Sequence, residues 1–166
     1  MSNQRKALLG ERYYTNNSGE LQIIGYAEKS LYEVRFFSTG YTTKARLCKI
    51  KAGKVKDKLL PKIYGVACIG VGKYNSKNSP VLYSRYKHML ARCYSGNYPH
   101  YEGCTVCERW LNFQNFAEDC LSLPGYTDSL SGLDLDKDTL VEGNKIYSPS
   151  TCQFISRADN FRFALK

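Results

Sequence analysis

The chain has 166 residues, of which 43% are hydrophobic and 23% are charged, and this composition is typical of a folded globular protein. No stretch approaches the ~18 apolar residues that a membrane-spanning helix needs, and the N-terminus has no signal-peptide pattern, so we expect no membrane partner and a cytoplasmic location. The formal net charge of +9 favours a polyanionic partner.

The first half of the chain has the pattern of antiparallel strands. Short runs rich in β-branched and aromatic residues cover residues 21–26 and 31–37, and a roughly alternating stretch covers residues 41–50. Turn-forming residues at 16–19, 38–40 and 52–53 separate these runs. We expect a three-stranded meander that could lie against a DNA groove, although a purely structural sheet has the same pattern.

Residues 64–74 form an apolar stretch that is interrupted by Gly65, Gly70 and Gly72. Their spacing does not fit the dinucleotide fingerprint, and no P-loop lysine follows. We therefore predict a strand with tight turns here and no nucleotide site.

The second half begins as a helix over residues 80–94. Pro80 suits the first helical position, and Ser79 is a candidate cap. Apolar side chains at helical spacing predict its buried face, and a second helix is expected over residues 112–121. A loop-rich segment follows, then a strand at 152–155 and a short helix from about Ser156. The predicted fold class is α+β, with a basic β-rich module over residues 1–75 and a helix-rich module over residues 76–166.

Basic residues are concentrated in the first hundred positions. From Lys44 to Arg92 there are 13 Lys or Arg residues and one acidic residue, Asp57. Such a segment repels itself unless a polyanion is nearby, and nucleic-acid phosphates are the commonest polyanion. A merely soluble basic surface is the alternative. The residues that we expect to contact DNA are Lys44, Arg46, Lys49, Lys51, Lys54, Lys56, Arg85, Lys87 and Arg92.

Two groups of residues have the composition of metal sites. Cys104 and Cys107 have zinc-knuckle spacing, but no second such pair exists among the seven cysteines, so we expect reduced thiols and no structural zinc. Asp134, Asp136 and Asp138 alternate along the chain and offer the oxygen ligands that Mg²⁺ or Ca²⁺ prefers. The calcium-loop pattern fails at its glycine and glutamate positions, which leaves a Mg²⁺ site or a loop with turn-capping aspartates.

One ordered series of residues extends over about half of the chain, from 80 to 163. It consists of Tyr83-x-x-Tyr86-x-x-Met89-Leu-x-Arg92-Cys-Tyr94, Val106-Cys-Glu-Arg-Trp110-Leu-x-Phe113-x-x-Phe116, Leu135-Asp-Lys-Asp138, Gly143-Asn-Lys-x-Tyr147-Ser-Pro-x-x-Cys152-Gln-Phe154 and Asn160. The series resembles a family of small bacteriophage proteins related to HNH homing endonucleases, which are often joined to APETALA-type DNA-binding modules. The N-terminal half looks like the leader region of such proteins through residues 38–41, 53–57 and 64–66.

The resemblance implies that the second module ends in a ββα metal motif. In active relatives of this class, a histidine acts as general base and a divalent ion stabilises the leaving oxygen. Lys137 stands at the aligned histidine position, and lysine is normally protonated at neutral pH, so the motif is expected to be degenerate. The residues that the resemblance places at the catalytic positions are Asp136, Lys137, Asn144 and Asn160, with Asp134, Asp136 and Asp138 as candidate Mg²⁺ ligands.

We expect a phage-type double-stranded DNA-binding protein on a catalytically degenerate HNH-like scaffold, located in the cytoplasm of an infected bacterial cell. Two alternatives stay open. The first is an active Mg²⁺-dependent DNA endonuclease or nickase. The second is a host-takeover or anti-defence protein that binds a host protein. RNA is also a possible polyanion, because basic charge with many tyrosines suits single strands.

Overall fold

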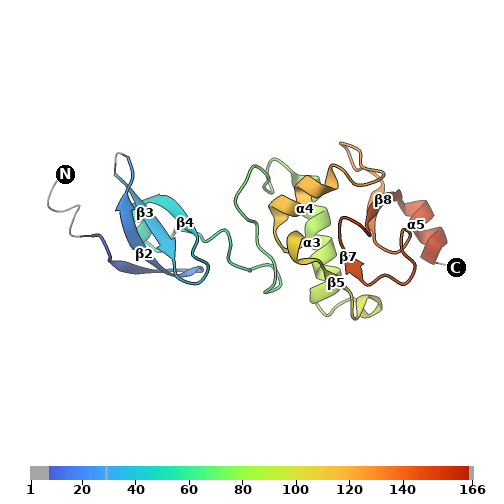
Figure 1. The fold of residues 1–166 in the computed structure, drawn as a ribbon, viewed down its shortest axis with the longest axis horizontal. Coiled ribbons are helices and arrows are strands. Elements are labelled where there is room, and N and C mark those ends of the chain that lie inside the picture. The colour runs from blue at the N-terminus through green and yellow to red at the C-terminus, as the bar shows by residue number, and fades with distance from the viewer. Residues whose placement is uncertain (1–7, 29, 165–166) are drawn as a thin grey trace. The chain divides into compact units, whose positions relative to one another are not determined.

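The computed structural model describes residues 8–28 and 30–164, and it shows an α+β protein built from two compact units that meet between Leu60 and Pro61 (Figure 1). The sequence predicted the boundary between the two modules after residue 75. Residues 61–75 instead belong to the second unit, because Ile63 and Ala67 are part of its hydrophobic core. Each unit is described by itself below.

Unit 1 is an antiparallel sheet with strand order β1-β2-β3-β4. Its strands are β1 (Arg12–Thr15), β2 (Gly19–Tyr26), β3 (Leu31–Phe36) and β4 (Thr42–Arg46). The expected meander corresponds to β2, β3 and β4, and β1 adds a fourth strand at the edge next to β2. The sheet therefore has two edge strands, β1 and β4.

The strand expected over residues 41–50 ends at Arg46, and helix α2 (Leu47–Lys51) replaces its second part. Side chains alternate between the two faces of a strand, so a strand continuing from the buried Ala45 would turn Lys49 into the core. The helix instead buries Ile50 completely and leaves Lys49 exposed. The gain from burying an isoleucine, together with the avoided burial of an ammonium group, explains the change.

The core of unit 1 lies on one face of the sheet. It contains Leu21, Ile23, Tyr32, Val34, Phe36, Ala45, Ile50 and Val55. The opposite face carries polar side chains on the alternate positions, among them Arg12, Gln22 and Arg35. One face is thus apolar and packed, and the other is polar, as is usual for an antiparallel sheet.

Unit 2 is organised around helix α3 (Pro80–Tyr94), whose bounds match the prediction. Pro80 occupies the first turn, but the Ser79 hydroxyl does not cap the helix, because it donates to Asn78 Oδ1 at 3.0 Å. Helix α4 (Phe113–Cys120) also matches, and Asn112 caps it by accepting a hydrogen bond from Gln114 N at 2.9 Å. Two 3₁₀ turns, η1 (Pro99–Tyr101) and η2 (Glu108–Leu111), lie between the helices.

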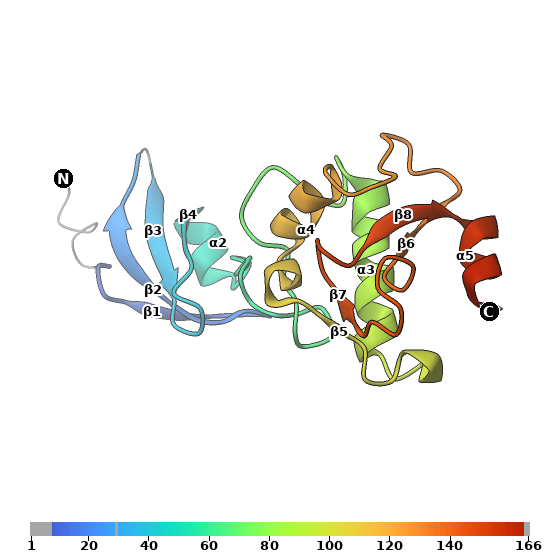
Figure 2. The same ribbon diagram turned by 45° about the vertical axis from the view of Figure 1, so that its right-hand side comes forward.

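Short strand pairs complete unit 2 (Figure 2). Strand β5 (Thr105–Val106) pairs in parallel with β7 (Ile146–Tyr147), and β6 (Leu133–Asp136) pairs in antiparallel with β8 (Gln153–Ser156). Helix α5 (Arg157–Ala164) follows β8 directly. Residues 64–74 form turns with isolated bridges, such as Cys68 with Asn112, instead of the expected strand.

Aromatic side chains fill the core of unit 2. Trp110 and Phe116 make an edge-to-face contact with ring centroids 5.1 Å apart, and Tyr86 lies 5.2 Å from the rings of Phe113 and Phe116. All seven cysteines of the chain are described, and all have free thiols. None of the helices formed by residues 8–28 and 30–164 combines the length and the apolar character needed to span a bilayer.

Candidate nucleic-acid interface

A groove of about 700 Å³ runs along the β4 edge of unit 1. Six of its lining residues are cationic: Lys44, Arg46, Lys49, Lys54, Lys56 and Lys58. The others are Leu31, Tyr41, Thr43, Ala45 and Val55, so no carboxylate lines the groove. We call this surface the basic groove.

Three local patterns bring these cations together. In β4, Lys44 and Arg46 are exposed on the face opposite the buried Ala45. Helix α2 carries Lys49 in its last turn. Residues 54–58 then alternate strictly, with exposed lysines at 54, 56 and 58 and buried residues at 55 and 57.

The single acidic residue of this segment does not neutralise the groove. Asp57 is only 5% exposed, and its carboxylate accepts hydrogen bonds from the Thr39 hydroxyl at 2.6 Å and from Leu59 N at 2.9 Å. Within the described residues, no carboxylate oxygen lies within 4.0 Å of a nitrogen of the six groove cations. Their charge is therefore available to an anionic partner.

The structure places the predicted DNA-contact residues in three kinds of environment. Lys44, Arg46, Lys49, Lys54 and Lys56 line the basic groove. Lys51 is exposed on α2 but is not part of the groove lining. Arg85, Lys87 and Arg92 lie on α3, in the other unit. Lys58 was not among the predicted residues, although its alternate spacing after Lys54 and Lys56 is a signal that could have identified it.

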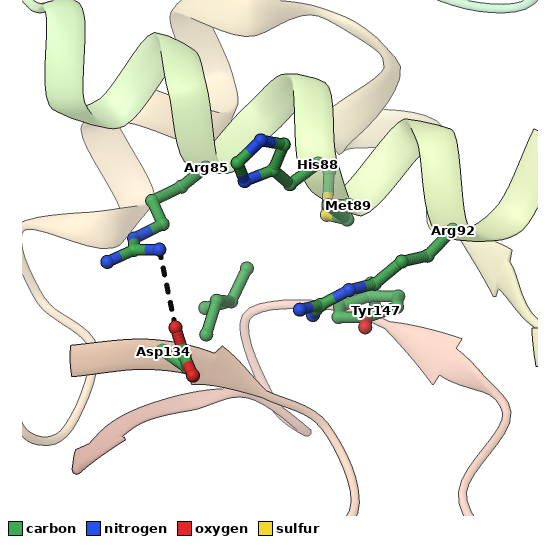
Figure 3. A pocket seen from close by; sticks show the side chains of 7 residues that line it. Arg85, His88, Met89, Arg92, Asp134 and Tyr147 are labelled. Atoms are coloured by element: carbon green, nitrogen blue, oxygen red, sulfur yellow. Dashed lines mark hydrogen bonds and ion pairs between the residues drawn. The ribbon is translucent and has the colours of Figure 1, made fainter. Parts of the chain in front are cut away.

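Arg85 and Arg92 are engaged within unit 2 (Figure 3). Arg85 points from α3 toward Asp134, and Arg92 lies against Tyr147. Arg85 pairs with Asp134 at 3.3 Å and also donates to the Leu133 carbonyl. The Arg92 guanidinium lies 5.4 Å from the Tyr101 ring centroid. The hollow between these side chains has a volume of about 10 Å³, room for about one water molecule.

The three alternating aspartates do not converge. Asp134 pairs with Arg85 at 3.3 Å and with Arg157 at 3.7 Å. Asp136 accepts hydrogen bonds from the backbone of Asp138 and Thr139 at 3.1 and 2.8 Å, which is turn capping. In the part of the chain that the structure describes, no three His, Cys, Asp or Glu side chains are grouped to hold a metal ion. In the described residues, the three aspartates are therefore not gathered around one point as ligands of a single ion.

Lys137 is a buried structural donor. Its side chain is 6% exposed, and Nζ donates to the Asn144 carbonyl at 2.9 Å and to the Asp138 carboxylate. Burial acts to lower the pKa of Lys137, but the hydrogen bond to Asp138 and the charge of Asp138 outweigh burial and raise it. Lys137 is thus protonated at neutral pH and cannot accept a proton from water.

The other residues at the catalytic positions have different surroundings. Asn144 Nδ2 donates to the carbonyls of Lys137 and Ile146, both at 2.8 Å, and so ties Asp136, Lys137 and Asn144 into one loop. Asn160 lies on α5 and is half-buried. The structure brings three of the four predicted residues together, and their hydrogen bonds stabilise the loop itself.

Burial raises the pKa of several thiols in unit 2. Burial raises the pKa of Cys93 to about 11 and that of Cys152 to about 12, so both are protonated at neutral pH. The thiolate is the form that binds metals and reacts with electrophiles. Burial also raises the pKa of Cys107, the second cysteine of the knuckle-like spacing.

Strands β6 and β8 pair in antiparallel and α5 follows β8, while β7 lies between the two strands in the chain. Comparisons with protein-family models, with curated proteins and with solved structures find no significant match to this chain. The relationship to HNH endonucleases therefore stays a prediction from the sequence.

Proposed function

We propose that the protein binds double-stranded DNA through the basic groove of unit 1. One observation carries this proposal: six cations line a single groove and, among the residues that the structure describes, none of the six is ion-paired and no carboxylate lines the groove. Six unpaired cations in one groove repel one another. A bound polyanion neutralises this repulsion and releases its own counterions, which favours binding.

The lining of the groove favours a duplex over a single strand. Proteins that bind single strands present aromatic side chains on which bases stack. The only aromatic residue in the lining, Tyr41, is half-buried and stacked against Phe36, with ring centroids 6.1 Å apart. The groove thus offers charge without a stacking surface, which suits contact with a phosphate backbone.

We propose binding without cleavage. The residue at the general-base position, Lys137, is a protonated internal donor, and the three aspartates each have separate partners. Unit 2 would then serve as a folded scaffold of HNH-like ancestry, in the cytoplasm of an infected bacterial cell. An active Mg²⁺-dependent nuclease and a binder of a host protein are the alternatives that the experiment must separate.

The experiment is a titration of labelled duplex DNA with the full chain at several salt concentrations, with EDTA or with Mg²⁺, followed by a denaturing gel. If all six cations contact phosphates, log K should fall with log[salt] with a slope of about −5. Salt-dependent binding with intact DNA supports the proposal. Nicks that require Mg²⁺ would support the nuclease instead. An absence of binding at low salt would overturn both and direct attention to host proteins, sought by co-purification after nuclease treatment.

A further inference from the structure

The free edge of strand β4 lies in the basic groove. β4 stands at one end of the strand order β1-β2-β3-β4, so one of its edges pairs with β3 and no described strand pairs with the other. Successive residues of a strand point to opposite faces of a sheet, yet every residue from Thr43 to Arg46 lines the groove. A groove that contacts side chains of both faces runs along the edge between them, where the unpaired main-chain groups of β4 lie.

The register with β3 identifies these unpaired groups. Phe36 N donates to the Tyr41 carbonyl at 2.9 Å, so the ladder between the two strands starts with a hydrogen-bonded pair. Hydrogen-bonded and non-hydrogen-bonded pairs alternate along an antiparallel ladder. The odd-numbered residues of β4 therefore bond to β3, whereas the N–H and C=O groups of Lys44 and Arg46 point away from β3 and into the groove.

The groove offers more than charge. Ala45 and Val55 belong to the buried core of unit 1 and also line the groove. Lys44 and Arg46 project from the opposite face of β4. The edge thus has an apolar side and a cationic side. A phosphate backbone uses the cations alone, whereas an extended peptide also pairs with the main chain and packs against the apolar side chains.

The charge of the groove decides which kind of strand can pair there. Lysines on an edge strand oppose pairing with a second copy of the same chain, because two cationic edges repel each other. Lys54, Lys56 and Lys58 line the same groove and add to this repulsion. Opposite charges on neighbouring strands stabilise the pairing instead. An incoming strand must therefore carry carboxylates.

We propose that an extended acidic segment of a partner protein binds in the basic groove as a fifth strand, antiparallel to β4. Strand addition of this kind takes its affinity from main-chain hydrogen bonds and its specificity from contacts of alternate side chains. Residues directly opposite each other in an antiparallel pair share a face, so acidic residues stand opposite Lys44 and Arg46. The residues between them face Ala45 and Val55. The segment thus alternates acidic and apolar residues.

This segment and duplex DNA would compete for the same lysines, a consequence that rests on the proposed DNA binding. The partner is then a protein that controls access of DNA to the groove. The two ligands differ in their response to salt. A short peptide lacks the condensed counterions of a duplex, so its affinity should fall less steeply with salt concentration.

The test is fluorescence anisotropy of the full chain with short labelled peptides in which glutamate and valine alternate. One peptide is unmodified, one is N-methylated on its glutamates, and a matched one is N-methylated on its valines. In the proposed register the N–H groups of the glutamates bond to Lys44 and Arg46, whereas those of the valines point away. The glutamate-methylated peptide should therefore bind about tenfold more weakly than the other two.

Two variants of the protein separate the main chain from the charge. Lys44→Gln removes the charge and keeps the N–H group, and Lys44→Pro removes both. Proline is tolerated on an edge strand where the N–H group faces outward. Lys44→Pro should bind the unmodified peptide about fivefold more weakly than Lys44→Gln does, because one more hydrogen bond is lost. Circular dichroism checks that both variants fold, and the comparison of methylated peptides needs neither of them.

The opposing results are distinct. Equal binding of the three peptides would overturn strand addition, and a loss confined to the valine-methylated peptide would overturn the antiparallel register. Binding of duplex DNA without binding of any peptide would overturn this inference and leave the proposed function intact. Binding of the peptide without binding of duplex DNA would overturn the proposed function alone. If both bind, unlabelled duplex should displace the peptide, and a failure to displace it would overturn the shared groove.

Discussion

The basic groove of unit 1 and the α3 side of unit 2 differ in how their cations are used. In unit 1, six cations lie together on a groove, and none of them has an ion pair with another described residue. In unit 2, Arg85, Lys137 and Arg109 each pair with an aspartate of the same unit. The comparison shows that a surplus of lysine and arginine in a sequence does not by itself indicate a binding surface, because the fold pairs some of these charges internally.

The largest expected effect concerns the basic groove. The triple variant Lys54→Gln, Lys56→Gln, Lys58→Gln should weaken duplex binding at 0.1 M salt by about two to three orders of magnitude and flatten the salt slope by about 3, because three phosphate contacts are lost. Fluorescence anisotropy at several salt concentrations measures both. The matched control, Lys73→Gln, Lys77→Gln, Lys145→Gln in unit 2, removes the same charge from exposed positions. Equal losses in the two variants would mean that only net charge matters.

The next effect concerns the buried cation of unit 2. Lys137→Met keeps the aliphatic volume but removes the hydrogen bond to the Asn144 carbonyl. It also removes the cation that lies 5.8 Å from the Tyr101 ring centroid and 5.9 Å from the Tyr147 ring centroid. The free energy of unfolding should fall by about 2 kcal/mol, since a buried hydrogen bond to a charged group is lost. Chemical denaturation measures this, with the exposed Lys145→Met as control. Unchanged stability with altered DNA binding would place Lys137 at an interface instead.

A third effect depends on pH. Asp119 accepts two hydrogen bonds from Arg109, at 2.7 and 2.8 Å, and one from Trp110 Nε1 at 2.9 Å. The Arg109 hydrogen bond holds the pKa of Asp119 below its usual value, although burial opposes this. Stability from this carboxylate is thus present above a pH of about 3.9 and is lost as the pH falls through the lowered folded-state pKa.

Asp119→Asn should therefore lower the free energy of unfolding by about 1.5 kcal/mol at neutral pH, and the difference from wild type should shrink as the pH falls below about 4. Thermal unfolding at a series of pH values gives this comparison. Glu118→Gln, an exposed neighbour on α4, is the control. A difference that does not vary with pH would mean that the shape of the side chain matters and its charge does not.

The smallest effect tests whether the groove has a defined edge. Lys51 is exposed on α2, next to a groove that its side chain does not line. Lys51→Gln should change the affinity for DNA by less than about twofold at 0.1 M salt and leave the salt slope unchanged, because its side chain does not line the groove. An effect equal to that of Lys56→Gln would show that the DNA contact extends over α2.

The sequence predicted the features that depend on local patterns. Pro80 and helical periodicity defined α3, and β-branched runs defined β2 and β3. It also predicted a dense basic segment, which contains most of the groove. Features that depend on distant partners were missed. The change from strand to helix at Leu47 follows from the need to bury Ile50, and the internal use of Arg85 requires Asp134, 49 residues away in the chain.

The predicted metal cluster illustrates the same limit. Alternate spacing shows that Asp134, Asp136 and Asp138 are near one another along the chain, but each side chain then meets different neighbours. Asp136 caps a turn of its own loop, whereas Asp134 contacts residues of α3 and α5. Which carboxylates meet is decided by the packing of helices that spacing does not describe.

The position of the unit boundary has a consequence for how the protein could have diversified. All six groove cations precede Pro61. A duplication or exchange of the gene segment for unit 1 would thus transfer the whole basic groove. Any unit joined to it by the chain would be tethered to the molecule that the groove binds. Such a tether raises the local concentration of whatever it carries to the millimolar range. Substitutions in unit 2 would leave unchanged the surface that we propose binds DNA.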